Sequence, residues 1–127
     1  MSEAILSKTA PAPIGPYSQA IRAGDFLFCS GQVGLDPASG KFAGEDAASQ
    51  ARQVMKNIEA VLTAGGASFS EVVKTTIFLV DMNDFTTVNE VYGAAFAGGP
   101  PPARSTVAVA ALPRGARVEI EVIARLA

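Results

Sequence analysis

Residues 46–64, DAASQARQVMKNIEAVLTA, carry the clearest secondary-structure pattern in the chain. The apolar positions in this stretch are Ala47, Ala51, Val54, Met55, Ile58, Val61 and Leu62. They recur at the spacing of a helix that packs one face against a core. Asp46 is suited to cap the first turn and Gly65–Gly66 to end the last one, so the stretch predicts a complete helix.

Strand and helix patterns flank this helix on both sides. The predicted strands, bounded by glycine and proline turns, cover residues 4–6, 18–23, 26–29, 71–80, 104–111 and 117–126. A second helix, capped by Asp81 or Asn83, is predicted over about 84–97. Residues 31–44 are expected to be mostly loop because turn residues dominate them.

The order β-β-β-α-β-α-β-β belongs to the α+β class and predicts one domain over residues 1–127. The two helices are expected to cover one face of a mixed sheet. The opposite face would then carry threonine, alanine, serine and charged side chains. That pattern favours association between copies of the chain over exposure to solvent.

Composition narrows the class of function. Apolar residues make up 49% of the chain and the net charge is −2, so neither disorder nor a nucleic-acid partner is predicted. No apolar run approaches the roughly 20 residues of a membrane helix, and no secretory signal is visible, which favours the cytosol. Histidine is absent and Cys29 is the lone cysteine. Ser-His-Asp and Cys-His catalysis are therefore excluded, as are metal sites built from histidine or several thiolates.

Two charged residues stand within otherwise apolar strands near the end of the chain. Arg104 opens the predicted strand 104–111, and Glu119 lies between Val118 and Ile120. A charge in such a place is costly unless it is paired or meets a ligand, and a guanidinium matches a carboxylate with two parallel hydrogen bonds. The pattern predicts a site for a small carboxylate, although an arginine in a salt bridge at a strand edge fits it too.

Several motifs over residues 5–126 resemble the Rid (YjgF) family of enamine and imine deaminases, and the set is similar to its RidA subfamily. The most specific part is Pro102-Ala103-Arg104-Ser105-x-Val107, followed by Leu112 and by Val118-Glu119-Ile120. The supporting motifs lie at residues 12–19, 30–32, 73–76, 81–85 and 88–92. This chain departs from many members at Thr106, where they carry cysteine.

The resemblance implies a chorismate-mutase-like fold and a homotrimer with ligand sites between subunits. It implies hydrolysis of 2-enamines or 2-imines, such as 2-aminoacrylate, 2-iminopropanoate and 2-iminobutanoate, to a 2-keto acid and ammonia without a cofactor. Thr106 would remove thiol chemistry at its position. Hydrolysis would remain, because the attack of water on an imine needs positioning and not a thiol.

The resemblance also selects site residues, each with a plainer alternative. Arg104 would clamp the substrate carboxylate, and Glu119 would orient water or relay a proton. Glu121 has the same strand periodicity as Glu119, and either could be a solvated side chain. Tyr17 would line the pocket and contribute its hydroxyl group. Alternatively, it would be a core tyrosine that follows a proline turn.

The remaining expected contacts involve smaller residues. Ser30 and Gly31 would present a hydroxyl and a backbone amide to substrate or water, or form a plain turn. Asn89 would reach the pocket from the second helix, or be a polar residue on the helix surface. Thr106 completes the expected substrate contacts, and Cys29 is predicted to be a small buried strand residue.

Strand geometry argues against a site within one subunit. If the last two strands pair about a turn near Arg114, Glu119 lies opposite Val109, and Arg104 is about five residues away along the strand. At roughly 3.3 Å per residue the separation is on the order of 16 Å. Arg104 of one subunit and Glu119 of the next are therefore expected to form the site.

Three other functions remain open. A non-catalytic regulatory trimer could bind a small carboxylate through the same arginine. A chaperone-like trimer would depend on exposed apolar surface instead. Endoribonuclease activity fits poorly with a net charge of −2 and no histidine.

Overall fold

The computed structural model describes residues 2–127. The strands are β1 (Ser2–Ile5), β2 (Ala20–Ala23), β3 (Phe26–Val33), β4 (Val72–Leu79), β5 (Ala103–Ala108) and β6 (Val118–Arg125). The helices are α1 (Ala47–Ala64) and α2 (Phe85–Ala94), with single 3₁₀ turns at Phe69–Glu71, Met82–Asp84 and Pro113–Gly115. This order of strands and α-helices is the predicted one, and it confirms the α+β class.

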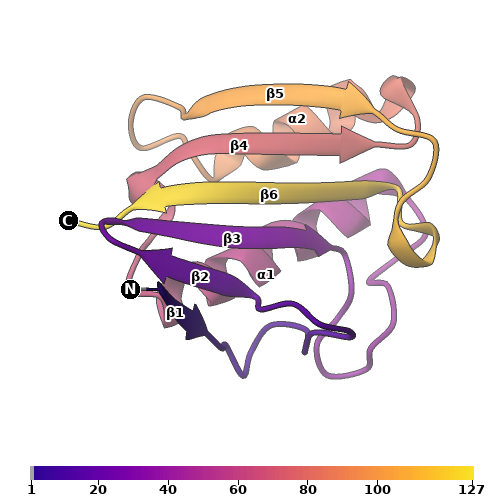
Figure 1. Cartoon of the computed structure of the whole chain (residues 1–127). Helices are drawn as coiled ribbons and strands as arrows, with labels where there is room; N and C mark the ends of the chain where they lie inside the picture. Colours follow the sequence, from indigo (N-terminus) through magenta and orange to yellow (C-terminus); the bar gives the residue numbers. More distant parts are fainter. Residues whose placement is uncertain (1) are drawn as a thin grey trace.

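The strands form one mixed sheet in the order β1-β2-β3-β6-β4-β5 (Figure 1). The assumption that the last two strands pair with each other is wrong, because β4 lies between β5 and β6. β5 runs parallel to β4 after the α2 crossover, as a parallel pair requires. The chain then crosses the end of β4, where the Val109 N–H donates to the Leu79 carbonyl and the Val80 N–H donates to the Arg117 carbonyl. β6 therefore returns on the far side of β4, antiparallel to it.

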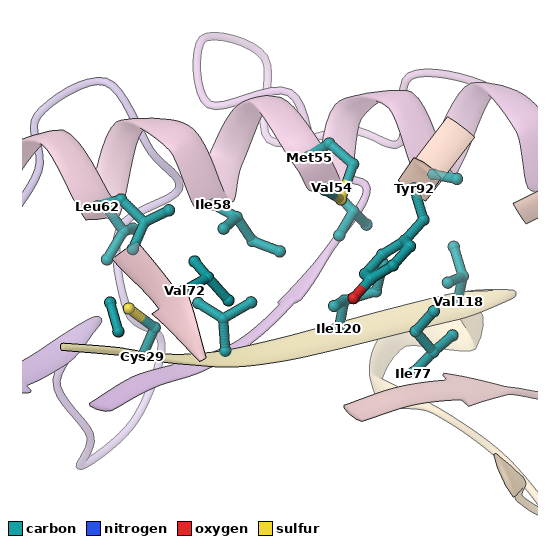
Figure 2. Close-up of a cluster of buried hydrophobic side chains, with 14 of the residues drawn as sticks. Cys29, Val54, Met55, Ile58, Leu62, Val72, Ile77, Tyr92, Val118 and Ile120 are labelled. Atoms are coloured by element: carbon teal, nitrogen blue, oxygen red, sulfur yellow. The ribbon is translucent and has the colours of Figure 1, made fainter. Parts of the chain in front are cut away.

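Both helices lie on one face of the sheet, as predicted (Figure 1). The core lies between α1 and this face. Val54, Ile58 and Leu62 point from α1 toward the sheet in Figure 2, and each is at most 1% exposed. Burial of each such side chain stabilises the fold by about 1.5–3 kcal/mol. Asp46 caps α1 as predicted, since its carboxylate accepts a hydrogen bond from the Ser49 N–H at 3.0 Å.

The structure departs from prediction at several element ends; β5, for example, stops at Ala108 and not at residue 111. α2 stops at Ala94, three residues before the predicted end, and Asp81 caps the preceding 3₁₀ turn by accepting from the N–H of Asn83. Asn83 is thus a donor and not a cap. β3 continues to Val33 through residues predicted as loop, with a register shift against β6 between Cys29 and Gln32. Such a bulge keeps a strand paired across an irregular residue.

The sheet face that points away from the helices has no cover within residues 2–127 (Figure 1). We call it the open face. It exposes Phe26, Phe28 and Val107 at 39%, 44% and 41%, so it is more apolar than the predicted mixture of small and charged residues. Lys74 donates across strands to Ser105 Oγ at 3.2 Å. Such a patch on a small chain supports the expectation that copies associate through this face.

Candidate functional site

The predicted site residues fall into two clusters. Tyr17, Ser30, Gly31 and Glu119 line one pocket of about 480 Å³, which we call the Glu119 pocket. Its other lining residues are Pro11, Ala12, Ile14, Gln32, Val33, Leu35, Pro113 and Arg114. Arg104, Asn89 and Thr106 do not line it, and they form a second group on β5 and α2, the Arg104 cluster.

The two clusters lie on opposite faces of the sheet. Arg104 is in register with Thr75, which is 1% exposed beneath the helices. Glu119 is in register with Phe78, and Phe78 with Val107 on the open face. Paired residues in a sheet point to the same side, so Arg104 and Glu119 point to opposite sides. The assumed strand pairing was wrong, yet one chain still does not present both side chains to one small ligand.

Glu119 is positioned by β6 against the bulge of β3. A Cβ atom placed on Gly31 would lie 2.7 Å from Glu119 Oε2, so the carboxyl group packs directly over the Gly31 backbone. Partial burial raises the pKa of Glu119, and the neighbouring negative charge of Glu121 raises it further. The result is a carboxyl group that takes up a proton more readily than an ordinary glutamate.

The outer wall of the Glu119 pocket is the proline-rich segment that ends at Tyr17. Gln19, which is 1% exposed, fastens this segment by donating from Nε2 to the Pro11 carbonyl at 2.8 Å. Tyr17 itself is 52% exposed, so the alternative of a core tyrosine is wrong. Sequence reasoning missed the part played by Gln19, because its partners lie in a segment without regular structure.

Ser30 joins the pocket wall to β3. Its hydroxyl donates to the Ser18 carbonyl at 2.6 Å, and its N–H donates to the Gln19 carbonyl at 2.9 Å. The hydroxyl hydrogen is therefore already used within the chain. Ser30 can accept a hydrogen bond from a ligand or water through its remaining lone pair, but it does not offer the expected donor.

Arg104 is held by α2. Its Nη1 donates to Asn89 Oδ1 at 2.5 Å, and its guanidinium carbon lies 5.1 Å from the Tyr92 ring centroid and 5.6 Å from that of Phe85. Within residues 2–127 the one ion pair joins Arg117 to Asp84, so the alternative of an Arg104 salt bridge is wrong. The guanidinium remains free to meet an anion.

Asn89 and the aromatic residues share a stripe of α2. Phe85, Asn89 and Tyr92 are spaced by four and then three residues, which places them on one helix face. That spacing was visible in the sequence and could have shown that Asn89 faces the sheet. Asn89 is exposed on the surface of α2, and it accepts a hydrogen bond from Arg104, so it belongs to the Arg104 cluster without lining the Glu119 pocket.

Thr106 lies two residues from Arg104 on the same side of β5. Its Oγ1 is the one buried side-chain polar atom in residues 2–127 that lacks a hydrogen-bond partner. Leaving such an atom unpaired costs about 1–3 kcal/mol. Thr106 Oγ1 is therefore available to a hydrogen-bond partner from outside the chain, beside Arg104 on the same strand.

The described part of the chain gives little support to thiol chemistry, metal binding or a membrane-spanning helix. Cys29 is buried, and burial raises its pKa to about 12, so it is a packing residue as predicted and not a ready nucleophile. Residues 2–127 hold no group of three or more side chains arranged to bind a metal ion. None of their helices has the length and apolar character to cross a membrane.

Comparisons with known proteins agree with this architecture. A family model described as Endoribonuclease L-PSP matches residues 7–126. The chain is 56% identical over 124 residues to Protein DfrA of Myxococcus xanthus, covering 96% of this chain and 94% of that protein. It is 54% identical over 121 residues to the 2-iminobutanoate/2-iminopropanoate deaminase of Mus musculus, covering 94% and 89% of the two.

A solved structure shares the whole fold. The crystal structure of E. coli TdcF with bound serine has a TM-score of 0.94 and 39% identity, covering 98% of this chain and 99% of that chain. The match therefore extends from sequence motifs to three-dimensional arrangement. By its family model, its relatives and its fold, this chain belongs to the Endoribonuclease L-PSP family, also called Rid or YjgF.

Proposed function

We propose that this protein hydrolyses small 2-imino acids, and the 2-enamines that tautomerise to them, to 2-keto acids and ammonia. The proposed site unites the Arg104 cluster of one subunit with the Glu119 pocket of the next. The observation that carries this proposal is that the two clusters lie on opposite faces of one sheet, so each lacks a partner within the chain. The deaminase name of the Mus musculus relative supports the reaction class.

The proposed reaction balances without any further reactant. An enamine first takes a proton on carbon to become the imine. Water then adds to the imine carbon: a C–O bond forms and the C=N π electrons move to nitrogen, which takes up a proton. The tetrahedral intermediate collapses to the ketone, the C–N bond breaks and ammonia leaves. Positioning of water and substrate is the main requirement, because the imine carbon is already electrophilic.

Arg104 would bind the substrate carboxylate. A guanidinium carries five N–H donors, and Asn89 takes only one of them through Nη1. The remaining donors suffice for two parallel hydrogen bonds to a carboxylate. Thr106 Oγ1 would find its missing partner in the substrate or the attacking water.

Glu119 would exchange protons with the attacking water and the leaving nitrogen. Its ionised form accepts a proton from water, and its protonated form returns one to nitrogen. Because its pKa is raised, Glu119 interconverts between its protonated and ionised forms closer to neutral pH than an ordinary glutamate does. Tyr17 and Ser30, at the pocket wall, would hold the water through their hydroxyl oxygens.

Glu121→Gln is expected to move the acidic limb of the pH–rate profile to lower pH. The negative charge of Glu121 raises the pKa of Glu119, so removing that charge lowers this pKa. A base that must be ionised then becomes active at lower pH. The kcat/KM profile from pH 4 to 8 measures the shift, and an unchanged or upward-shifted limb would contradict the role of Glu119 as base.

Gly31→Ala is expected to lower kcat roughly 10- to 100-fold with little loss of stability. The new methyl group would collide with the end of the Glu119 side chain, which can move at small cost but would then be misplaced by about an ångström. Gly93→Ala is a matched control, because a Cβ there meets nothing within 4 Å. Steady-state kinetics and thermal unfolding of both variants measure the effect, and equal kcat values would contradict it.

The function itself is tested by release of pyruvate from 2-iminopropanoate, generated in situ by an amino-acid oxidase. We expect the protein to accelerate release and Arg104→Ala to abolish the acceleration. Binding of pyruvate without acceleration would favour the regulatory alternative. Suppression of aggregation that survives Arg104→Ala, without imine hydrolysis, would favour the chaperone-like one. Cleavage of RNA in place of imine hydrolysis would overturn the proposal.

A further inference from the structure

The Arg104 guanidinium lies against aromatic rings to which the proposed chemistry assigns no part. The ring centroids of Tyr92 and Phe85 lie 5.1 and 5.6 Å from its carbon. Separations below about 6 Å are in the range of cation–π attraction. Both rings belong to α2, whereas Arg104 belongs to β5. The helix therefore touches the guanidinium through aromatic faces as well as through Asn89.

The Tyr92 ring is itself fixed from the sheet. Tyr92 is 4% exposed, and Figure 2 shows its side chain reaching from α2 toward the sheet. Its hydroxyl shares a hydrogen bond of 2.7 Å with the hydroxyl of Thr75, which is 1% exposed. Thr75 is the residue of β4 that pairs directly with Arg104. Thr75, Tyr92 and Arg104 are thus each in contact with the other two.

We infer that Tyr92, anchored by Thr75, is a positioning residue that orients the Arg104 guanidinium before a carboxylate binds. The inference rests on the proposed function. A free arginine side chain samples many rotamers and loses that freedom when it binds a ligand. A ring that restricts the guanidinium beforehand removes part of that loss. The benefit falls on binding of the carboxylate, so it is expressed in KM more than in kcat.

The test compares Tyr92→Leu with Phe96→Leu in the full assembled protein. Phe96 is 8% exposed and its ring centroid lies 4.8 Å from that of Tyr92, so both substitutions remove a ring from one cluster. Arg104 makes its cation–π contacts with Tyr92 and Phe85, and none with Phe96. Tyr92→Leu is expected to raise KM for 2-iminopropanoate roughly 5- to 20-fold with kcat changed less than threefold. Phe96→Leu should leave KM within about twofold.

Tyr92→Phe separates the ring from its anchor. It keeps the aromatic face and removes the hydrogen bond to Thr75, so KM should rise by about two- to threefold. Arginine Nε–Hε NMR signals give a readout that needs no turnover. The Arg104 signal should lose its ring-current shift in Tyr92→Leu and keep it in Phe96→Leu. If Tyr92→Leu does not fold, Phe85→Leu provides the same comparison, because the Phe85 ring also contacts Arg104 and is only half-buried.

The outcomes separate the inference from the proposed function. Equal KM values for Tyr92→Leu and Phe96→Leu, with an unchanged Arg104 signal, would overturn the inference while imine hydrolysis stands. An inactive wild-type protein would overturn the proposed function and with it the role in catalysis, whatever the NMR signals show. A selective rise in KM together with a shifted Arg104 signal would support both.

Discussion

Arg104→Ala is expected to lower kcat/KM for 2-iminopropanoate by about 10²- to 10⁴-fold. Charge-assisted hydrogen bonds contribute about 1.5–3 kcal/mol each, and Arg104 is proposed to make two to the substrate carboxylate. Coupled detection of pyruvate at several substrate concentrations measures the ratio. Full activity of the folded variant would remove Arg104 from the site.

Arg104→Lys is the matched control for this change. Lysine keeps the positive charge but loses the planar fork, so it should recover only part of the lost kcat/KM. Lysine also loses the geometry that lets Asn89 hold Nη1 while other N–H groups face outward. If lysine restored full activity, charge alone would explain the effect and the bidentate clamp would be wrong.

Glu119→Gln is expected to lower kcat by about 10²- to 10⁴-fold, the usual contribution of a positioned general acid or base. Glutamine fills the same space over Gly31 but does not exchange protons near neutral pH. KM should change little, because the carboxylate clamp lies elsewhere. Single-turnover kinetics with pre-formed imine measure the step most directly.

Glu121→Gln serves as the control for the same chemistry. Glu121 lies two residues along β6 on the same face and is exposed, so its loss should leave maximal kcat near the wild-type value. If Glu119→Gln retained full turnover, Glu119 would have no role in proton transfer. If Glu121→Gln lost more than Glu119→Gln, the choice between these two glutamates would be reversed.

Local features of the fold were readable from the sequence. The α1 boundaries follow from an apolar stripe, an aspartate cap and a glycine pair, all of which act within a few residues. The alternation of Glu119 and Glu121 with buried neighbours along β6 is local in the same sense. These features were predicted correctly because the forces that fix them act between near neighbours in the chain.

Non-local features were not readable in this way. Strand order depends on packing across the whole sheet, and nothing within residues 104–126 reveals that β4 lies between the last two strands. The extension of β3 past Gly31 depends on its pairing with β6 across a bulge. Considered from the sequence alone, Gly31 indicates a turn. In the fold, its lack of a side chain leaves space for the Glu119 carboxyl group.

The candidate site shows the same division. Family motifs selected the residues, but their separation into the Glu119 pocket and the Arg104 cluster needed the strand order. The contacts of Tyr92 and Thr75 with the Arg104 cluster were missed, because a tyrosine on an apolar stripe reads as core. It is indeed core, and one of its ring contacts is the guanidinium.

The central claim is that one active site needs Arg104 from one subunit and Glu119 from another. The most direct test mixes Arg104→Ala subunits with Glu119→Gln subunits, each inactive alone, by co-refolding at equal amounts. If the subunits assemble at random, about half of the sites receive an intact Arg104 and about half receive an intact Glu119. Roughly a quarter of the sites then contain both residues, so roughly a quarter of wild-type activity should return. A mixture of Arg104→Ala with the double variant should recover nothing. Mixed assemblies that contain both subunits, verified by native mass spectrometry, and yet remain inactive would contradict the claim.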